Sequence, residues 1–353
     1  ALIRKLPAVE TLGSVTVICS DKTGTLTENR MTVTVLDVAG HRLDLTESFR
    51  LRSPVWTGKQ PGLETARSHP TIGLLLAGAA LCNDAVLQPR GEQSYQAIGD
   101  PTEGALLVAA AKSGLLKSEL ENALPRLAEL AFDSDRKMMS TFHSARAEAV
   151  EECQGVLSDV CVHLGQTAVV QFTKGSVDGL TGACSAVLEN DQICPISEEW
   201  KARIRAANEN LARGGMRVLG IAYHALPALP SPATSSDERD LIFVGMVGMI
   251  DPPRPEVRDA VQICQTAGIR PIMITGDHPL TAAAIARVLG ILPLEGGSVL
   301  TGQELEGMSE DQLRQAVQVT SVFARVSPEH KLRIVGALQS LGNVAAMTGD
   351  GVN

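Results

Sequence analysis

Aromatic residues are scarce in this chain: Phe, Tyr and Trp make up 3% of its 353 residues, and only six residues are phenylalanine. Long apolar runs are also missing, because the two longest, residues 71–82 and 241–250, fall short of the roughly 20 residues that span a bilayer. The first residues lead into no apolar segment typical of a signal peptide. These absences predict a soluble chain without a membrane span.

Basic residues are fewer than acidic ones, 31 against 40, so the formal net charge is -9. This balance argues against nucleic acid as a partner. The seven cysteines contain no Cys-x-x-Cys pair, which favours reduced, buried thiols over disulfides or a zinc site. The length favours two domains, and a hydrophobic content of 44% is enough to build their cores.

The last hundred residues alternate short apolar stretches with segments that begin at proline and end at glycine, as helices often do. The predicted strands are residues 270–274, 321–324 and 344–347, and the predicted helices are residues 255–268, 279–290 and 328–342. Such alternation is typical of right-handed βαβ units on a parallel sheet. In these sheets the chemistry lies at the carboxyl ends of the strands.

A reactive loop is expected near the beginning of the chain, where the apolar residues 15–18 run into Cys-Ser-Asp-Lys-Thr-Gly-Thr-Leu-Thr, residues 19–27. Asp21 would lie at the end of a buried strand. Aspartate is a weak nucleophile, but phosphoryl transfer depends mainly on positioning and charge neutralisation, so a rigidly held carboxylate suffices. Residues 347–353, Met-Thr-Gly-Asp-Gly-Val-Asn, repeat the pattern of a strand followed by an acid, which suggests one site assembled across the fold.

The middle of the chain lacks the βαβ rhythm and predicts an α+β insertion with an antiparallel sheet. Its predicted strands are residues 31–38, 138–142, 169–173, 217–223 and 241–244, and its predicted helices are residues 103–112, 177–188 and 198–213. We therefore expect a discontinuous domain of residues 1–30 and 246–353 that carries an insertion of residues 31–245. The proline-rich residues 251–255 would form a stiff return hinge, or merely a loop.

Five segments together resemble the motifs of P-type ATPases, in the family's order. They are Asp21-Lys22-Thr23-Gly24-Thr25-Leu26-Thr27, Lys174-Gly175-Ser176, Asp251-Pro252-Pro253-Arg254, Thr275-Gly276-Asp277 and Thr348-Gly349-Asp350-Gly351-Val352-Asn353. The resemblance implies a haloacid-dehalogenase-like parallel-sheet phosphorylation (P) domain with a large inserted nucleotide-binding (N) domain. The large insertion and the segment around Phe132 are similar to the type II branch, which holds calcium and sodium/potassium pumps.

The resemblance implies that Asp21 attacks the γ-phosphorus of ATP and becomes an aspartyl phosphate. Thr23 occupies the position where hydrolytic relatives often keep a second Asp. Because threonine cannot relay a proton in the same way, the acyl phosphate should persist. The implied Mg²⁺ ligands are Asp21, the Thr23 carbonyl and Asp350, which are oxygen donors that Mg²⁺ prefers.

Lys331 lies near the beginning of a predicted helix, where anions are attracted, and the resemblance places it beside the phosphoryl group; the alternative is a solvated lysine. Thr275 and Gly276 would donate hydrogen bonds to phosphoryl oxygens. The other cofactor-binding residues implied in the P domain are Asp277, Arg325 and Asn353.

In the N domain the resemblance implies that Phe132 stacks on adenine, although burial in the core is the alternative from the sequence alone. Lys174 and Gly175 follow a predicted strand and suit an adenosine pocket. The further nucleotide contacts implied by the family are Glu103, Lys137 and Arg217.

The sequence therefore predicts the major cytosolic loop of a P-type cation pump, with ATP and Mg²⁺ as cofactors and calcium as the expected ion. The expected partners are the transported cation, through a membrane domain, and the actuator domain of the same protein. The family places a second acid directly after Asn353, where this sequence stops, so we expect weak activity of the chain alone. The competing hypotheses are a haloacid-dehalogenase phosphatase and a nucleotide-binding module without turnover.

Overall fold

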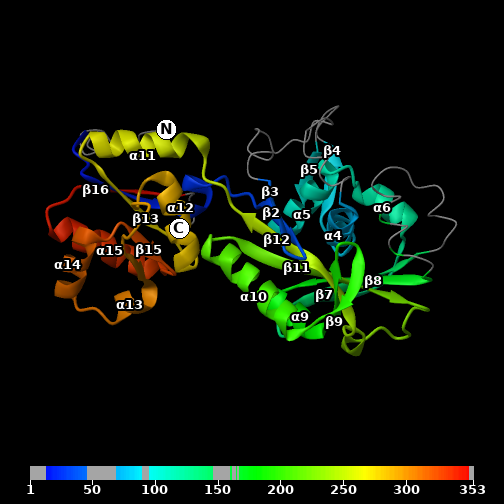
Figure 1. Ribbon diagram of the computed structural model, residues 1–353. Coiled ribbons are helices and arrows are strands. Elements are labelled where there is room, and N and C mark those ends of the chain that lie inside the picture. Colours follow the sequence, from blue (N-terminus) through cyan, green and yellow to red (C-terminus); the bar gives the residue numbers. More distant parts are fainter. Residues whose placement is uncertain are drawn as a thin grey trace. The chain divides into compact units, whose positions relative to one another are not determined.

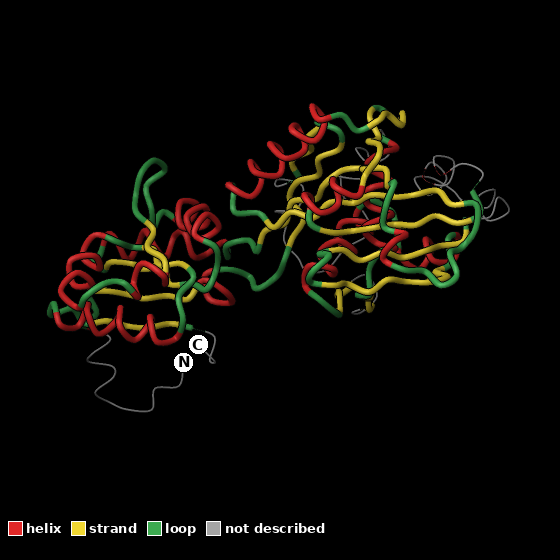
Figure 2. Tube along the Cα trace, turned by 90° about the horizontal axis from the view of Figure 1, so that it is seen from below, coloured by secondary structure: helices red, strands yellow, loops and turns green. Residues whose placement is uncertain are grey.

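The computed structural model describes residues 13–45, 69–89, 95–145, 160, 164 and 167–349. The chain divides into two compact units. Unit 1 comprises Ala1–Arg30, Ala212–Met216 and Asp251–Asn353, and unit 2 comprises Met31–Leu211 and Arg217–Ile250. Each unit is layered, with helices against a central sheet (Figure 2).

Unit 1 is built on a five-stranded sheet in the order β14-β15-β13-β1-β16, and all of its strand pairs are parallel. Its strands are β1 (Val17–Asp21), β13 (Arg270–Ile274), β14 (Val299–Thr301), β15 (Val322–Ala324) and β16 (Ala345–Thr348). Its helices are α11 (Pro255–Thr266), α12 (Pro279–Leu289), α13 (Gly302–Glu306), α14 (Glu310–Val319) and α15 (Pro328–Ser340). Helices α11 and α12 lie toward one face of the sheet, and α13, α14 and α15 lie toward the other (Figure 1). This is the parallel α/β architecture predicted from the sequence.

Unit 2 contains a nine-stranded sheet in its described part. The main order is β10-β9-β12-β11-β8-β7-β6, with β2 paired to β12 and β3 paired to β2. The strands are β2 (Thr32–Val38), β3 (His41–Asp44), β6 (Arg126–Asp133), β7 (Met138–Ser144), β8 (Val169–Gly175), β9 (Cys184–Glu189), β10 (Gln192–Pro195), β11 (Arg217–Leu226) and β12 (Leu241–Ile250). The pairs are antiparallel as predicted, except that β9 and β12 run parallel.

The helices of unit 2 are α4 (Pro70–Leu81), α5 (Pro101–Lys112), α6 (Lys117–Ala123), α9 (Val177–Ala183) and α10 (Glu198–Arg213), with a short 3₁₀ turn, η2 (Ser235–Asp237). A separate hairpin joins β4 (Val86–Pro89) to β5 (Tyr95–Ile98). The apolar run at residues 71–82 forms α4, which is buried along nearly its whole length because it packs against β8, β11 and β12. Among the described residues, none of the helices has both the length and the hydrophobicity that a membrane span needs.

Three expectations from the sequence differ from the structure. The helix expected over residues 177–188 ends at Ala183, because residues 184–189 pair with β10 and β12 as strand β9. The unit boundary lies after Ile250 rather than after residue 245, since β12 keeps its pairing with β2 up to Ile250. Cys194 and Cys264 are partly exposed, whereas three described cysteines are buried and all five are free thiols.

Candidate functional site

One edge of the parallel sheet collects the predicted residues of unit 1. Asp21 is the last residue of β1 and lies opposite Ile274, the last residue of β13. Ile274 in turn lies opposite Phe323 of β15, so Thr275 and Arg325 follow strands that end at the same edge. Parallel register therefore brings together side chains that are about 250 to 300 positions apart in the chain.

Asp21 is paired with a lysine from α15. The Lys331 Nζ atom lies 2.6 Å from Asp21 Oδ2, and the two side chains are only 13% and 6% exposed. Ser327 begins α15 with a capping box, in which its Oγ accepts the His330 amide and its own amide donates to His330 Nδ1. This cap fixes the first turn, and Lys331 follows directly. The structure thus rejects the alternative of a solvated lysine.

A buried cation, Lys22, directly follows Asp21 in the chain. Lys22 Nζ lies 2.6 Å from Asp277 Oδ2 and 3.6 Å from Asp251 Oδ2. The Asp251 carboxylate also accepts the Thr27 hydroxyl at 2.5 Å and the Arg30 amide at 3.0 Å. Lys22 and Asp251 were not among the predicted site residues, although both belong to the motifs. The position of Lys22 directly after Asp21 is the signal that could have found the first of them.

The loop after Asp21 turns sharply. Gly24 adopts a left-handed φ of 74°, which glycine reaches without the penalty of a Cβ, and Thr23 before it is extended rather than helical. The Gly24 carbonyl accepts a hydrogen bond of 3.0 Å from Arg254 Nη2, and Thr27 bridges to Pro253. The proline-rich return segment therefore braces the loop that carries Thr23.

Thr275 and its neighbours form the next part of the edge. Thr275 is 1% exposed, and its Oγ1 accepts the Asp277 amide at 3.1 Å, which leaves the hydroxyl proton free to donate. Gly276 is exposed. Arg325 is exposed as well and has a left-handed φ of 50°, and its amide donates to the Asp277 carbonyl at 3.0 Å.

The described part of β16 ends just before the second predicted acid. Thr348 Oγ1 lies 2.7 Å from Ser20 Oγ, so β16 reaches the same edge as Asp21. Asp350 and Asn353 lie outside the described residues. Among the residues that are described, no group of three or more His, Cys, Asp or Glu side chains is arranged to hold a metal ion.

The predicted residues of unit 2 gather around the end of β8. Lys174 is 6% exposed and forms an ion pair with Glu103, which lies in the first turn of α5. The other oxygen of Glu103 accepts the amides of Asp84 and Ala85 at 3.0 and 3.2 Å. Arg217, at the beginning of β11, donates to the Thr102 hydroxyl at 2.7 Å. These contacts bring Glu103, Lys174 and Arg217 to one region.

The β6–β7 hairpin carries the other two predicted residues. Phe132 is 63% exposed, which excludes the alternative of a core residue. Lys137 has a left-handed φ of 54° in the turn, and its carbonyl accepts the Ser176 amide at 3.0 Å. At Gly175 a Cβ atom would lie 2.6 Å from the Lys137 carbonyl oxygen, so only glycine lets β8 approach the hairpin this closely.

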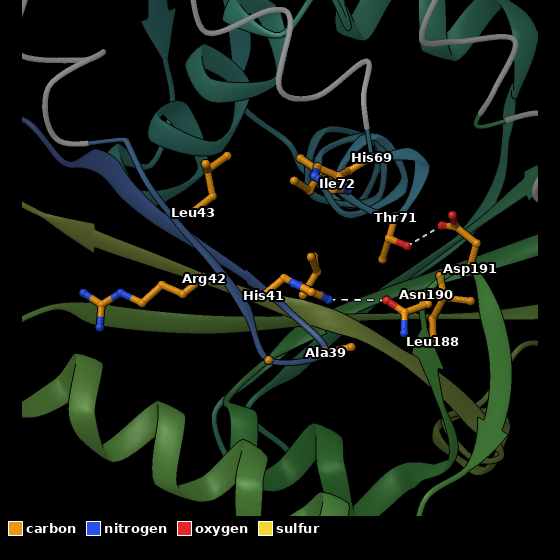
Figure 3. Close-up of a pocket in the computed structure, with 12 residues that line it drawn as sticks. Ala39, His41, Arg42, Leu43, His69, Thr71, Ile72, Leu188, Asn190 and Asp191 are labelled. Carbon is orange, nitrogen blue, oxygen red and sulfur yellow. Dashed lines mark hydrogen bonds between the residues drawn. The ribbon is translucent and has the colours of Figure 1, made fainter.

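Unit 2 also has a pocket of about 440 Å³ that lies elsewhere (Figure 3). It is lined by the β2–β3 hairpin, the beginning of α4 and the β9–β10 turn, where His41 Nε2 lies 3.3 Å from Asn190 Oδ1 and Thr71 donates to Asp191 at 2.6 Å. None of the predicted site residues lines it. The pocket is therefore separate from the candidate site.

Comparison with known proteins identifies similar chains. A family model described as P-type ATPase, cytoplasmic domain N, matches residues 71–256. The chain is 42% identical over 352 residues to calcium-transporting ATPase 1 of Bacillus cereus and 40% identical over 353 residues to the calcium-transporting ATPase of Bacillus subtilis. It is also 40% identical over 361 residues to the probable cation-transporting ATPase F of Mycobacterium bovis.

These matches cover 100% of this chain but 35 to 37% of the relatives, so the chain spans about a third of their length. The family model covers more than half of the chain, and it includes the region of the Glu103–Lys174 ion pair and the Phe132 hairpin. The chain therefore belongs to the P-type ATPase family.

Proposed function

We propose that the chain is the major cytosolic catalytic loop of a type II P-type cation pump. Unit 1 is then the P domain and unit 2 the N domain, and the γ-phosphate of ATP is transferred to Asp21. The observation that supports this most directly is the Asp21–Lys331 ion pair at the carboxyl edge of the parallel sheet. Its geometry suits a nucleophile whose negative charge must be offset as a negatively charged phosphoryl group approaches.

In the proposed reaction a carboxylate oxygen of Asp21 forms a bond to the γ-phosphorus, the bond from that phosphorus to the β–γ bridging oxygen breaks, and ADP leaves. Lys331 then turns from the carboxylate to the phosphoryl oxygens, and the Thr275 hydroxyl and Gly276 donate hydrogen bonds to these oxygens. Thr23 has no carboxylate with which to activate water. The aspartyl phosphate should therefore persist long enough to drive a conformational change.

Mg²⁺ suits the donors that the loop offers, because the Asp21 carboxylate and the Thr23 carbonyl are hard oxygen ligands. We propose these two and Asp350 as its protein ligands. When bound, the ion would offset the repulsion between the carboxylate and the triphosphate. The buried Lys22 keeps Asp251 and Asp277 charge-paired beside this site, which limits the negative charge that a triphosphate meets.

For the nucleotide we propose a site around the end of β8. The exposed ring of Phe132 would stack on adenine, and the Glu103–Lys174 pair would border the adenosine. Lys137, Gly175 and Arg217 would complete the set in unit 2. For unit 1 we propose Asp277, Arg325 and Asn353 as the cofactor-binding residues of the P domain. Binding of ATP to the chain, and its loss in Phe132→Ala, would support this site.

We further propose that the pump transports Ca²⁺, because two of the relatives are named calcium-transporting ATPases. The ion would bind in a membrane domain, and an actuator domain of the same protein would act on the aspartyl phosphate. The chain itself would be a loop on the cytosolic side of that membrane.

The decisive experiment is ³²P incorporation from γ-labelled ATP with Mg²⁺, with Asp21→Asn as the control. It should be run on this chain and on a version extended past Asn353. Acid-stable, hydroxylamine-sensitive label that vanishes in Asp21→Asn would support an aspartyl phosphate. Label only in the extended version would place the missing groups beyond Asn353. ATP binding without label in either version would favour the nucleotide-binding module, and phosphatase activity without adenine-nucleotide binding would favour the phosphatase.

A further inference from the structure

A buried carboxylate lies beneath the hairpin that carries Phe132. Glu238 comes from the segment between β11 and β12, directly after η2, and its side chain is 1% exposed. One of its oxygens forms an ion pair with Arg136, and the other accepts the Ser140 hydroxyl at 2.8 Å. A charge this deeply buried must be paired and hydrogen-bonded to be tolerated. Both partners belong to the β6–β7 hairpin, 98 and 102 positions away in the chain.

The main chain at Phe132 lacks regular strand pairing. Leu130 pairs with Ser140 and Asp133 pairs with Met138, so two residues of β6, Ala131 and Phe132, face a single residue of β7. This is a β-bulge, a feature that redirects side chains near binding sites. At this place the sheet ladder does not by itself fix the direction of the Phe132 ring.

Arg136 supplies the missing restraint. Its Nη1 atom pairs with Glu238, and its Nη2 atom donates to the Ala131 carbonyl at 2.9 Å. The planar guanidinium therefore links the buried carboxylate to the peptide that precedes Phe132. Because a guanidinium presents several donors in a fixed plane, orienting one side of it orients the other.

A second chain of hydrogen bonds connects Glu238 to β8, the strand that carries Lys174, which is predicted to bind the nucleotide. The Ser140 hydroxyl, which donates to Glu238, lies 2.9 Å from the Thr173 hydroxyl of β8. Thr173 directly precedes Lys174. One carboxylate is thus tied to the bulge that presents Phe132 and to the strand that presents Lys174.

We propose that Glu238 is a positioning residue for adenine recognition, acting through Arg136 on the bulge at Phe132. The inference rests on the proposed nucleotide site. Without the carboxylate, Arg136, whose side chain is 26% exposed, is free to turn to solvent and release Ala131. Phe132, at 63% exposure, has little packing of its own to hold its ring in place. The ring must then be ordered at the moment of binding, which weakens binding.

The test is a double-mutant cycle on ATP binding, measured by calorimetry with Glu238→Gln and Phe132→Ala. We expect Glu238→Gln to weaken ATP binding about tenfold in the native background, which is within the range of an aromatic–base stack. In the Phe132→Ala background the same change should have almost no effect, because the coupled group is gone. Equal effects in both backgrounds, or none in the native background, would overturn the proposal.

Asp237→Asn is the matched control. It makes the same change of charge one residue away, and the Asp237 carboxylate caps Thr234 within its own segment. ATP affinity should remain within about twofold of the native value. A tenfold loss here as well would show that any disturbance of the segment suffices, and would overturn the specific role of Glu238.

Two further measurements separate positioning from general stability. In protein labelled with 4-fluorophenylalanine, the ¹⁹F resonance of Phe132 should broaden or shift in Glu238→Gln while those of the buried phenylalanines stay unchanged; a native Phe132 resonance would contradict the proposal. Arg136→Lys keeps the positive charge but removes the planar guanidinium donors, so it should also weaken ATP binding. It serves as the test if Glu238→Gln fails to fold, and native ATP affinity in this variant would overturn the inference. If Phe132→Ala itself leaves ATP binding unchanged, the proposed adenine site is wrong, and not only the positioning role of Glu238.

Discussion

The ammonium group of Lys331 lies 2.6 Å from Oδ2 of Asp21, although 310 positions separate the two residues in the chain. The pair forms because β1 ends at Asp21 while the capped first turn of α15 delivers Lys331 to the same edge of the sheet. The proposed nucleophile and the cation that would offset its charge are thus already paired in the fold. Preorganised charge of this kind is often the largest contribution to a phosphoryl-transfer rate.

Replacing Lys331 by alanine should lower the initial rate of Asp21 labelling by about 100-fold or more, the scale expected when a charged group at the transition state is lost. Lys331→Arg keeps the charge and should retain part of the rate. Lys201→Ala is the control, because Lys201 is a partly exposed lysine of α10 paired with Glu198. The measurement is the ³²P time course in a version that phosphorylates, and native labelling in Lys331→Ala would refute the role proposed for the lysine.

Lys22→Met should destabilise unit 1 by about 3 kcal/mol, because it leaves Asp251 and Asp277 facing each other without their buried cation. Adding Asp277→Asn should recover part of this loss, since one of the uncompensated charges is removed. Urea unfolding followed by amide exchange in β1 and β13 reports on unit 1 separately. A decrease of less than about 1 kcal/mol in the free energy of unfolding would contradict this, because it would mean that solvent or a rearrangement stabilises the two unpaired carboxylates.

In unit 1, much of the architecture was predictable from local signals. Prolines at residues 255, 279 and 328 mark the first residues of α11, α12 and α15, and residues 270–274 form β13 as predicted. Proline at the first helical position and apolar runs of strand length are strong, local signals. The parallel register of these strands is enough to predict that Asp21, Thr275 and Arg325 lie close together. No side-chain contact has to be known for this prediction.

Contacts between distant segments were not predictable in this way. Residues 184–189 continue a helical pattern locally, but their pairing with β10 and β12 makes them a strand. Glu238 was missed for a similar reason, since its partner Arg136 is 102 positions away and a single carboxylate in a loop carries no periodic signal. In the first case tertiary pairing overrides local propensity, and in the second only the tertiary contact reveals the residue.

Gly175→Ala should destabilise unit 2 by about 1 to 3 kcal/mol and weaken ATP binding, because the new methyl group would lie 2.6 Å from the Lys137 carbonyl oxygen. The turn that holds Lys137 must move away from β8 to make room. Gly182→Ala is the matched control: it lies in α9 with nothing within 4 Å of the added atom, so it should be neutral or slightly stabilising. The measurements are the denaturant midpoints and the calorimetric ATP affinities of both variants. Equal stability and affinity in the two variants would show that the hairpin moves away from β8 without loss of free energy.

His143 should make unit 2 less stable in mild acid. Burial is the main cause that lowers the pKa of its imidazole to about 4, and the nearby charges of Arg126 and Lys117 act in the same direction, whereas the hydrogen bond to the Leu124 carbonyl opposes them. Because a carbonyl only accepts, Nδ1 carries the proton toward Leu124. With its pKa lowered to about 4 the folded ring is neutral near neutral pH, so Nε2 accepts from the Thr141 hydroxyl.

Between pH 6.5 and 4 the unfolded chain binds a proton at this histidine that the folded chain does not bind, so stability must fall as the pH falls. The contribution is fully present above pH 6.5, and its loss reaches on the order of 3 kcal/mol near pH 4. His143→Asn keeps a donor for the Leu124 carbonyl but cannot titrate, so its unfolding free energy should depend less steeply on pH over this window. Urea unfolding of both proteins at several pH values measures the difference, in which the contribution of the other histidines cancels. Parallel pH profiles, or an NMR titration of the His143 ring close to pH 6.5, would show that the ring is charged in the folded core after all.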